Sequence, residues 1–502
     1  MARLNVLAVV SEIFPLVKTG GLADVAGALP GALAAEEVGV RSLVPGYPPV
    51  LDALEGGVAV AALDDLFGGP ARIIAAQAAG LELFVIEAPH LYARDGDPYR
   101  DQDGRDWADN AFRFAALSRT ASLLAAGLID GYRPDVIHAH DWQAGLVPAY
   151  LHYGGAIEPP TVMTIHNIAF QGCFAAGLLA PLGLPPEAFS VQGVEYYGDV
   201  GYLKAGLQFA DRITTVSPTY AAEIRMPSGG MGLDGLLRGR GDVLSGILNG
   251  IDTTVWDPAH DQYLAARFDV ERLAERAKNK AALQARFRLR AGPQPLFGVI
   301  SRLSAQKGID LLFMALPVLL GNGGQLVVLG SGEPALEAEL RAIAGAHPDA
   351  VGAQIGYDEG LAHLIQGGCD VLLMASHFEP CGLTQLCAMR YGALPIVSHV
   401  GGLCDTVIDA NEMALAEGVG TGFHFSPVTS EMLAATILRV DGVWRQPEIW
   451  RQLQRNAMQT DVSWRRPAAR YAALYRELAN GSYGGSNGTT GTGELAVRSA
   501  SS

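Results

Sequence analysis

A loop near the N-terminus combines a positive charge with glycines, because it contains Lys18, Gly20 and Gly21. The apolar run before it, residues 4–10, predicts a buried parallel strand, and residues 22–38 after it follow a helical pattern. At a helix N-terminus, unpaired backbone N–H groups and the positive end of the helix dipole attract anions. Glycines leave room for a ligand, and the lysine adds a point charge. The pattern therefore predicts either an anion site or a tight turn that needs glycine and holds no ligand.

A second basic loop, residues 301–308, lies far down the chain, directly after the apolar run at residues 295–300. Arg302 and Lys307 place two positive charges where the next helix is expected to start. An arginine side chain can bind two oxygens at once, so this pair suits a diphosphate better than a carboxylate. The alternative is a solvated loop with ordinary basic residues.

A third loop, residues 377–385, follows another predicted strand and opens a helix. The hydroxyl of Thr384 and the backbone N–H groups of Gly382 and Leu383 could receive a phosphate or a hydroxyl. Glu379 is a carboxylate acceptor suited to sugar hydroxyls, although capping of the helix also explains a glutamate there.

Cys381 in the same loop is expected to be a small buried residue and not a nucleophile, because nothing in its sequence context lowers its pKa. The chain has five cysteines, an odd number, and none lies in a Cys-x-x-Cys pair. This usage is typical of a reducing cytoplasm, and it argues against a disulfide framework or a structural zinc site.

Polar residues also follow two apolar runs in the first half of the chain. Residues 135–140 end at Asp141, and residues 161–165 end at His166 and Asn167. In open parallel sheets, ligands bind at the edge where the strands have their carboxyl ends. His166 is therefore the best histidine candidate for chemistry, with a purely structural histidine as the alternative.

Metal binding is weakly supported. His138, His140, His166 and His363 are too dispersed in the sequence to predict a metal cluster. Residues 95–103 contain two Asp-x-Asp pairs, but they do not fit the pattern of an EF-hand loop. We expect that stretch to be a structural loop that does not lie beside either basic loop.

The elements that position these loops alternate as strands and helices, and the alternation restarts after residues 249–252. Two such series predict an α/β protein with two Rossmann-like, doubly wound parallel-sheet domains facing a cleft. We expect domains at residues 1–248 and 249–463. A last helix at 464–479 is expected to pack back on the first domain, followed by a disordered tail rich in Gly, Ser and Thr at 480–502.

Composition excludes several classes of protein. A hydrophobic share of 49% with a net charge of −16 describes a globular chain that does not bind nucleic acid, although one basic pocket remains possible. No apolar run is long enough, at about 18 residues, to predict a membrane span. The sequence has no P-loop motif, and no G-x-G-x-x-G follows the first strand, which disfavours a nicotinamide-dependent dehydrogenase.

Together these motifs resemble those of bacterial glycogen synthases over residues 4–478. The matching stretches are residues 11–12, 18–25, 106–107, 109–110, 138–142, 166–167, 171–172, 204–207, 215–220, 249–252, 301–308, 378–385, 401–403 and 405–406. The combination is specific to that family, whereas no single stretch is.

The resemblance implies a GT-B fold and retaining transfer of glucose from ADP-glucose to the non-reducing end of an α-1,4-glucan such as glycogen, with release of ADP. It implies no cofactor and no metal ion. The alternatives are a related GT-B enzyme that uses UDP-glucose or another acceptor, and a silent glucan-binding paralogue. Glycogen phosphorylase shares the fold, but the sequence has no matching pyridoxal-phosphate lysine motif.

The resemblance also implies roles for individual positions. The catalytic set it implies is His166, Arg302, Lys307 and Glu379. By position, Lys18 is expected to contact the nucleotide sugar, and Arg302 and Lys307 are expected to contact its diphosphate. Glu379 is expected to bind the glucosyl hydroxyls, and Asp141 and His166 are expected to line the glucosyl pocket. Tyr357 is expected near the adenine, and Thr384 is expected to contact a phosphate. The other donor-binding positions within the matching stretches are Gly20, Gly21, Asp24, Asn167, Cys381, Gly382 and Leu383. Domain closure is expected to bring Lys18 towards the basic loop of the second domain.

Four positions depart from the commonest pattern of the family. They are Gln143 in place of histidine, Ala375 in place of proline, His377 in place of arginine and Cys404 in place of alanine. His377 removes a permanent positive charge near the donor pocket, but the principal charges remain.

Overall fold

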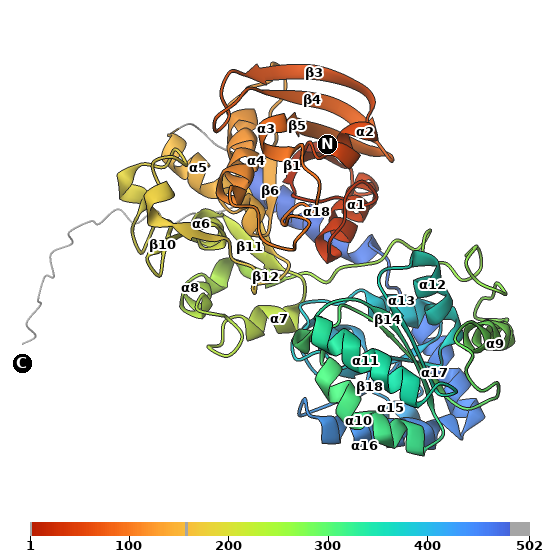
Figure 1. The fold of residues 1–502 in the computed structure, drawn as a ribbon. Helices are drawn as coiled ribbons and strands as arrows, with labels where there is room; N and C mark the ends of the chain where they lie inside the picture. The colour runs from red at the N-terminus through yellow and green to blue at the C-terminus, as the bar shows by residue number, and fades with distance from the viewer. Residues whose placement is uncertain (1–2, 156–158, 482–502) are drawn as a thin grey trace, which may run out of the picture.

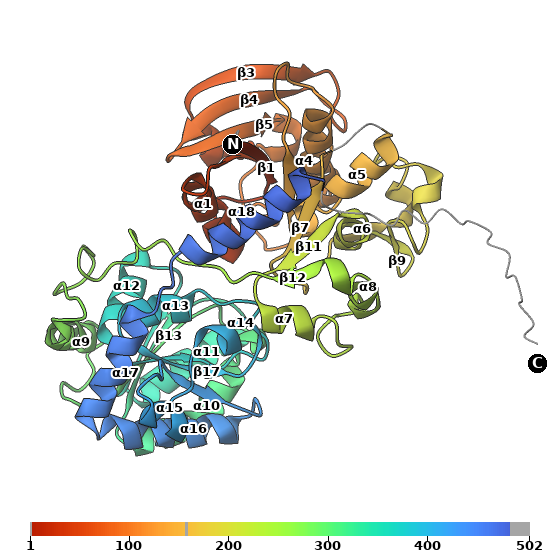
Figure 2. The same ribbon diagram turned by 180° about the vertical axis from the view of Figure 1, so that it is seen from behind.

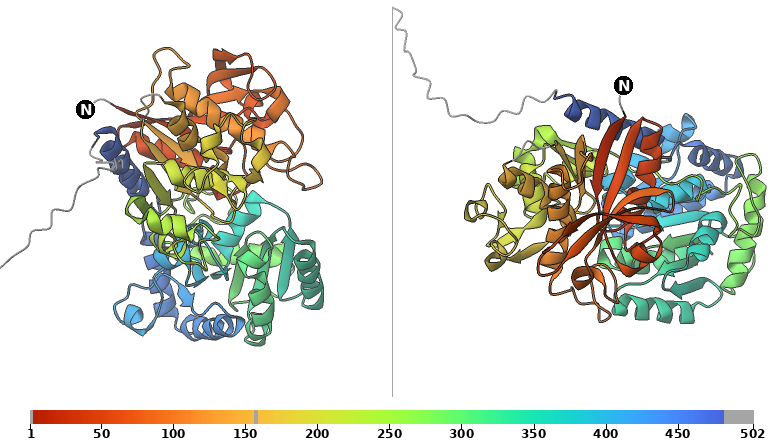
Figure 3. Two further views of the ribbon diagram at one scale, coloured as in Figure 1. Left: turned by 90° about the vertical axis from the view of Figure 1, so that its left-hand side faces the viewer. Right: turned by 90° about the horizontal axis from the view of Figure 1, so that it is seen from above.

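The computed structural model describes residues 3–155 and 159–481, which form two α/β lobes, each built mainly from one half of the chain (Figure 1). Of the tail expected at residues 480–502, residues 482–502 lie outside the described residues. Figure 3 shows the same two lobes from the side and from above. Within the described residues, no helix is long and apolar enough to cross a membrane.

The first lobe is built on a mostly parallel sheet. Its strands are β1 (Leu4–Val9), β2 (Val38–Pro45), β3 (Glu55–Leu63), β4 (Ala71–Ala78), β5 (Leu81–Glu87), β6 (Val136–His140), β7 (Thr161–Ile165), β11 (Arg212–Thr215) and β12 (Leu244–Gly246). In the described part of the chain they lie in the order β12-β11-β7-β6-β1-β2-β5-β4-β3. Only the pairs β3–β4 and β4–β5 are antiparallel among these neighbours. The carboxyl ends of β1, β6, β7 and β11 therefore share one edge.

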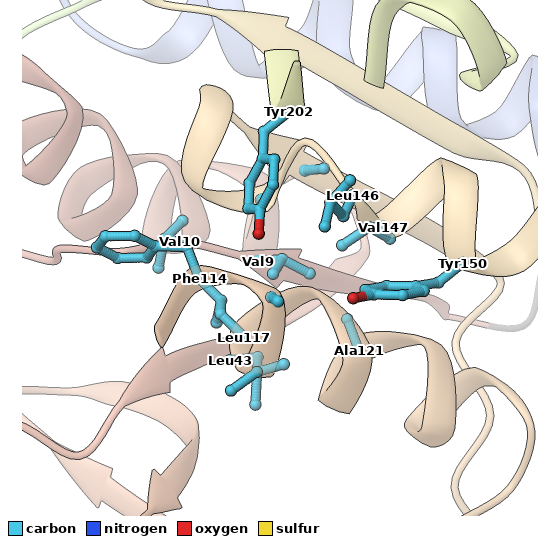
Figure 4. Packing of buried hydrophobic residues seen from close by; sticks show 14 of the residues in the cluster. Val9, Val10, Leu43, Phe114, Leu117, Ala121, Leu146, Val147, Tyr150 and Tyr202 are labelled. Atoms are coloured by element: carbon cyan, nitrogen blue, oxygen red, sulfur yellow. The ribbon is translucent and has the colours of Figure 1, made fainter. Parts of the chain in front are cut away.

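Helices cover both faces of this sheet. They are α1 (Gly21–Ala34), α2 (Pro48–Asp52), α3 (Pro89–Tyr92), α4 (Asn110–Ala125), α5 (Val147–Gly154), α6 (Tyr202–Phe209), α7 (Pro218–Glu223) and α8 (Asp234–Gly239). A small antiparallel sheet consists of β8 (Cys173–Ala175), β9 (Glu195–Tyr196) and β10 (Asp199–Gly201). Figure 4 shows Val9 of β1, Leu117 of α4 and Tyr150 of α5 packed in the buried core between the layers.

Several sequence-based assignments in this lobe were incomplete. The helix expected over residues 22–38 ends at Ala34, because Val38 already starts β2. The strands β3 and β4 were not predicted. They extend the sheet at its edge, where β3 is largely exposed and so lacks the alternation of a half-buried strand.

The second lobe has an entirely parallel sheet. Its strands are β13 (Leu296–Ile300), β14 (Gln325–Gly330), β15 (Val351–Ile355), β16 (Val371–Met374), β17 (Leu394–Ser398) and β18 (Phe423–Phe425), in the order β15-β14-β13-β16-β17-β18. Its helices are α9 (Arg276–Arg286), α10 (Ile309–Gly321), α11 (Pro334–Ala346), α12 (Glu359–Gly368), α13 (Thr384–Arg390), α14 (Gly401–Thr406), α15 (Glu412–Ala416), α16 (Ser430–Trp444) and α17 (Pro447–Gln459). The strands are nearly continuous apolar runs, as expected of strands buried on both faces.

The chain crosses between the lobes twice. Ile251 on the outward segment pairs with Ser463 on the returning segment. The last helix, α18 (Arg465–Ala479), then packs against α1 and β6 of the first lobe, as Figure 2 shows. Its Tyr475 hydroxyl lies 2.7 Å from His138 Nδ1 of β6, so the C-terminal helix is part of the first lobe's core.

Candidate active site

The loop after β1 is held by a buried carboxylate. Glu12 accepts hydrogen bonds from the backbone N–H groups of Thr19 and Gly20 and from the Thr19 hydroxyl. Burial raises the pKa of Glu12, although these hydrogen bonds act to lower it. Because these loop groups are already bound by protein, the group in this loop that can move to a ligand is Lys18. Its Nζ lies 2.7 Å from Asp24 Oδ1.

The same loop approaches the other lobe. A Cβ placed on Gly21 would lie 3.9 Å from Leu383 Cδ1, which belongs to the loop before α13. Glu359, at the start of α12, interacts electrostatically with both Lys18 and Asp24. The structure therefore places Lys18, Gly21 and Asp24 at the boundary between the lobes.

Three histidines of the first lobe, His138, His140 and His166, lie together although they are dispersed in the sequence. His140 Nδ1 lies 2.9 Å from His166 Nε2, and the rings of His138 and His140 lie 3.9 Å apart. The cause is the parallel pairing of β6 with β7, which sets His140 opposite Thr164, two residues before His166. Among the described residues, no group of three or more potential ligands could hold a metal ion.

These histidines are neutral at physiological pH. Burial lowers the pKa of His166 to about 3 and that of His140 well below its ordinary value. A neutral imidazole can exchange hydrogen bonds with a sugar hydroxyl, but it does not supply a positive charge.

Asp141 fixes the loop that carries His166. It follows β6 with φ of +55°, an uncommon conformation for a residue with a side chain. Its Oδ1 accepts hydrogen bonds from His166 N at 2.7 Å and from Asn167 N at 3.4 Å. Burial raises the pKa of Asp141 to about 7, against the effect of these two hydrogen bonds.

A largely buried ion pair connects two loops of the second lobe. Lys307 Nζ lies 2.6 Å from Glu379 Oε2, and Ser376 Oγ donates to the same oxygen at 2.9 Å. Arg302 is more exposed, and its Nη2 lies 3.4 Å from Gln306 Oε1. The pair therefore fixes the Glu379 carboxylate, and it leaves the Arg302 guanidinium accessible at the same edge of the sheet.

The close approach of these loops requires glycine. Gly308 has φ of +64°, and a Cβ there would lie 1.9 Å from the Ala375 carbonyl oxygen. The contact brings the loop after β13 against the loop after β16.

The remaining donor-site candidates follow neighbouring strands. Gly382, with φ of +73°, and Leu383 lead into Thr384, the first residue of α13. Cys381 is buried, and burial raises its pKa to about 12, so its thiol is protonated at neutral pH. Tyr357 follows β15, and 73% of its surface is exposed, which leaves the ring free to stack on a ligand.

The acidic stretch at residues 95–103 lies beside the first basic loop, which corrects the expectation that it does not. The Tyr99 hydroxyl hydrogen-bonds to Ser11 Oγ at 2.8 Å and donates to Glu12 Oε1 at 3.0 Å. The Asp97 carboxylate accepts backbone N–H groups of its own turn, as expected of a structural loop.

The sequence analysis assigned no role to the supporting residues Glu12, Tyr99, Ser376 and Glu359. Glu12 carried a signal, because it lies within a stretch that matches the family. Tyr99 carried none, since 87 residues separate it from its partner Glu12.

Two α/β lobes whose basic loops lie at the carboxyl ends of parallel strands have the architecture of a GT-B glycosyltransferase, and comparisons with known proteins place the chain in that class. The starch synthase catalytic domain family matches residues 5–239, and glycosyl transferases group 1 matches residues 283–455. The catalytic domain of starch synthase IV from Arabidopsis thaliana, solved with ADP and acarbose bound, superposes with a TM-score of 0.85 at 33% identity, covering 95% of this chain and 99% of that one. Sucrose-phosphate synthase from Thermosynechococcus elongatus, at 18% identity and a TM-score of 0.59, shares the fold.

Two relatives of known family show which family within this class the chain belongs to. Glycogen synthase from Methylocella silvestris is 62% identical over 479 residues, which are 95% of this chain and 99% of the relative. Glycogen synthase from Acidiphilium cryptum is 60% identical over 478 residues, or 95% of this chain and 100% of the relative. The chain belongs to the bacterial glycogen synthase family, and it is a glucosyltransferase of glycogen synthesis. The resemblance found in the sequence is confirmed.

Proposed function

We propose that the donor is ADP-glucose and that the acceptor is the non-reducing end of an α-1,4-glucan, with the anomeric configuration retained and ADP released. The observation that carries this proposal is the Lys307–Glu379 ion pair, with Arg302 at the same sheet edge. The positive charges of Lys307 and Arg302 suit a diphosphate, and the carboxylate of Glu379 suits the hydroxyls of a sugar. The ADP bound to the related starch synthase IV also supports an adenine nucleotide.

Breaking the bond between the glucose C1 and the phosphate oxygen leaves negative charge on ADP and positive charge on the sugar. Arg302 and Lys307 stabilise the first of these charges without transferring a proton. Lys307 also compensates the charge of Glu379, whose carboxylate oxygens accept hydrogen bonds from glucose hydroxyls. Lys18 of the first lobe contacts the donor once its ion pair with Asp24 breaks.

The first lobe holds the glucosyl group. Asp141 fixes the backbone of His166 and Asn167, and His140 fixes the His166 ring through its Nε2 atom. The other ring nitrogen, Nδ1, is then available to a sugar hydroxyl. Because His166 is neutral, it orients the sugar and does not act as an acid.

Retention in a single step requires the acceptor hydroxyl to attack C1 from the face that the diphosphate leaves. The new C1–O bond forms as the C1–phosphate bond breaks, and the hydroxyl proton passes to the departing phosphate oxygen. This route needs no pair of acid and base carboxylates of the kind that glycosidases use. We propose that it needs no metal ion and that it runs in the cytoplasm, where the five unpaired cysteines would stay reduced.

The test uses the purified chain, glycogen and either ADP-glucose or UDP-glucose, with and without EDTA. Nucleotide release and glucan chain growth are measured together. We expect transfer from ADP-glucose, much weaker transfer from UDP-glucose, and no effect of EDTA. A preference for UDP-glucose would contradict the proposed donor, and no transfer from either would support the silent-paralogue alternative.

A further inference from the structure

Two short helices join the lobes beside the site. α7 follows β11 of the first lobe, and α14 follows β17 of the second. They lie against each other, as Figure 2 shows. Parts of both helices lie in stretches that match the family, but the sequence analysis assigned no role to the residues that make these contacts.

Each helix supplies a carboxylate to a backbone N–H of the other. Asp405 of α14 accepts hydrogen bonds from Thr219 of α7, at 2.8 Å from its backbone N and at 2.6 Å from its hydroxyl. Glu223 of α7 accepts a hydrogen bond at 2.9 Å from the backbone N of Gly401 in α14. We name Thr219, Glu223, Gly401 and Asp405 the interdomain clasp.

On its own side, α7 contacts the loop that carries His166. The hydroxyl of Tyr220 accepts a hydrogen bond at 3.1 Å from the backbone N of Ile168, two residues beyond His166. Tyr220 is buried, so this contact is shielded from water. A shift of α7 therefore moves the loop that holds the sugar from the first lobe.

On the other side, α14 lies directly on the backbone of the Glu379 loop. The Gly402 N–H bonds to the carbonyl oxygens of Glu379 and Pro380, both at 3.1 Å. A Cβ on Gly401 would lie 2.0 Å from the Glu379 carbonyl oxygen, so no side chain fits between the two segments. A shift of α14 therefore moves Glu379.

We propose that Thr219, Glu223 and Asp405 are positioning residues that lock α7 to α14 and so set the distance between His166 and Glu379 in the glucosyl-transfer step. The clasp does not touch the substrate. It acts through the two loops, and it keeps the lobes together while the donor bond breaks, which excludes water from the glucosyl group. The inference rests on the proposed roles of His166 and Glu379.

The test compares Thr219→Val with Thr219→Ser, and Asp405→Asn with the wild type. Valine keeps the shape of threonine but loses the donor, whereas serine keeps the hydroxyl. We expect Thr219→Val and Asp405→Asn to lower kcat about 10-fold or more, because small misplacements of reacting groups cost large factors in rate. We expect Thr219→Ser to retain most of the wild-type kcat. The fraction of ADP-glucose hydrolysed instead of transferred should rise in the two impaired variants.

A double-mutant cycle tests whether Thr219 and Asp405 act through their mutual contact or affect the activity independently. If the two residues act on each other, Thr219→Val/Asp405→Asn loses no more activity than the worse single variant. Glu223→Leu tests the second contact separately, and Glu223→Gln keeps an acceptor oxygen for Gly401. Matched controls are Thr429→Val, at the N-cap of α16, and Asp441→Asn, which pairs with Arg445 on α16. Both lie outside the clasp and should leave kcat within about 2-fold of the wild type.

Small-angle scattering supplies a readout that does not depend on turnover. We expect the donor-free wild type to be more compact than Thr219→Val, Asp405→Asn and Glu223→Leu, with similar circular dichroism spectra for all four proteins. Equal compactness and wild-type kcat in the three variants would overturn the clasp, as would strictly additive losses. If the wild type transferred no glucose from ADP-glucose, the donor assignment would fail, while scattering would still decide the clasp.

Discussion

Lys307 Nζ and Glu379 Oε2 lie 2.6 Å apart, and the pair joins the loop after β13 to the loop after β16. The site therefore contains a positive charge for the diphosphate and a fixed carboxylate for the sugar in one contact. Such a buried pair is sensitive to the loss of either partner, because the remaining charge is left without compensation.

Lys307→Ala is expected to lower kcat by about 10²-fold or more, as the loss of a group that stabilises transition-state charge typically does. Steady-state transfer from ADP-glucose to glycogen measures it. Lys278→Ala is the matched control, because Lys278 forms an exposed ion pair with Glu275 away from the site. Near-normal turnover of Lys307→Ala would mean that the diphosphate binds elsewhere.

The burial of Asp141 predicts a pH dependence of donor use. Its pKa is raised to about 7, so the carboxyl is protonated below that pH and ionised above it. If the ionised form holds the sugar loop and a hydroxyl, kcat/KM for the donor rises with pH through about 7 and then levels off. Asp141→Asn should remove this step. His166→Gln should lower kcat but keep the step, since His166 with a pKa of about 3 does not titrate there.

The loops that follow strands were predictable because apolar runs in this chain are sharply bounded by polar residues and glycines. Lys18, Arg302, Lys307 and Glu379 all lie at such boundaries. Long apolar runs are a strong signal for buried parallel strands, and the carboxyl ends of those strands share an edge whatever their order.

Contacts that depend on strand order or on lobe docking carry no such signal. The pairing of His140 with His166 requires that β6 and β7 be neighbours. The contact between Thr219 and Asp405 joins residues 186 positions apart on different lobes. The number of residues between the partners of such a contact is set by the elements that lie between them. The spacing in the sequence therefore does not reveal the contact.

Tyr357 is expected to contribute binding energy equally to the ground state and the transition state. Stacking of a base on an aromatic ring is worth about 1–3 kcal/mol. Tyr357→Ala should therefore raise KM for ADP-glucose about 5-fold or more with kcat nearly unchanged. Tyr357→Phe keeps the ring and serves as the control. Unchanged KM in the alanine variant would show that the adenine does not stack there.

His363 predicts a pH dependence of stability. Burial acts to lower its pKa, but hydrogen bonds to Asp261, at 2.7 Å, and Glu359 outweigh it and raise the pKa to about 9. The unfolded histidine has a pKa of about 6.5. The charged folded form therefore stabilises the protein fully below about pH 6.5, and this contribution is lost as the pH rises through about 9.

His363→Gln should lower the free energy of unfolding by about 3 kcal/mol at pH 6.5, because it leaves the buried Asp261 without a charged partner. The difference in melting temperature between wild type and variant should shrink as the pH rises from 6.5 to 9.5. His260→Gln is the control, since His260 pairs with Asp257 on the surface. A difference that stayed constant over this range would mean that His363 is neutral in the folded protein.

The contact between Tyr475 and His138 predicts that α18 stabilises the first lobe. Tyr475→Ala leaves a cavity among apolar side chains and should cost about 3–5 kcal/mol. Tyr475→Phe keeps the ring but leaves buried His138 Nδ1 without its partner, so it should cost about 1–3 kcal/mol. Glu477→Ala, which breaks the more exposed ion pair with Arg212, should cost less than about 1 kcal/mol.

Urea unfolding followed by circular dichroism measures the free energy of unfolding of these three variants. If the lobes unfold in separate transitions, the transition that shifts in the variants is assigned to the first lobe. We expect the loss in free energy of unfolding to be largest for Tyr475→Ala, smaller for Tyr475→Phe and smallest for Glu477→Ala. This order follows from burial, because apolar contact area contributes most to the docking of α18. Equal midpoints for Tyr475→Ala and the wild type would mean that α18 does not bear on the stability of the sheet that carries His140 and Asp141. The observed order therefore decides whether the returning helix supports the sugar-binding lobe or only ends the chain beside it.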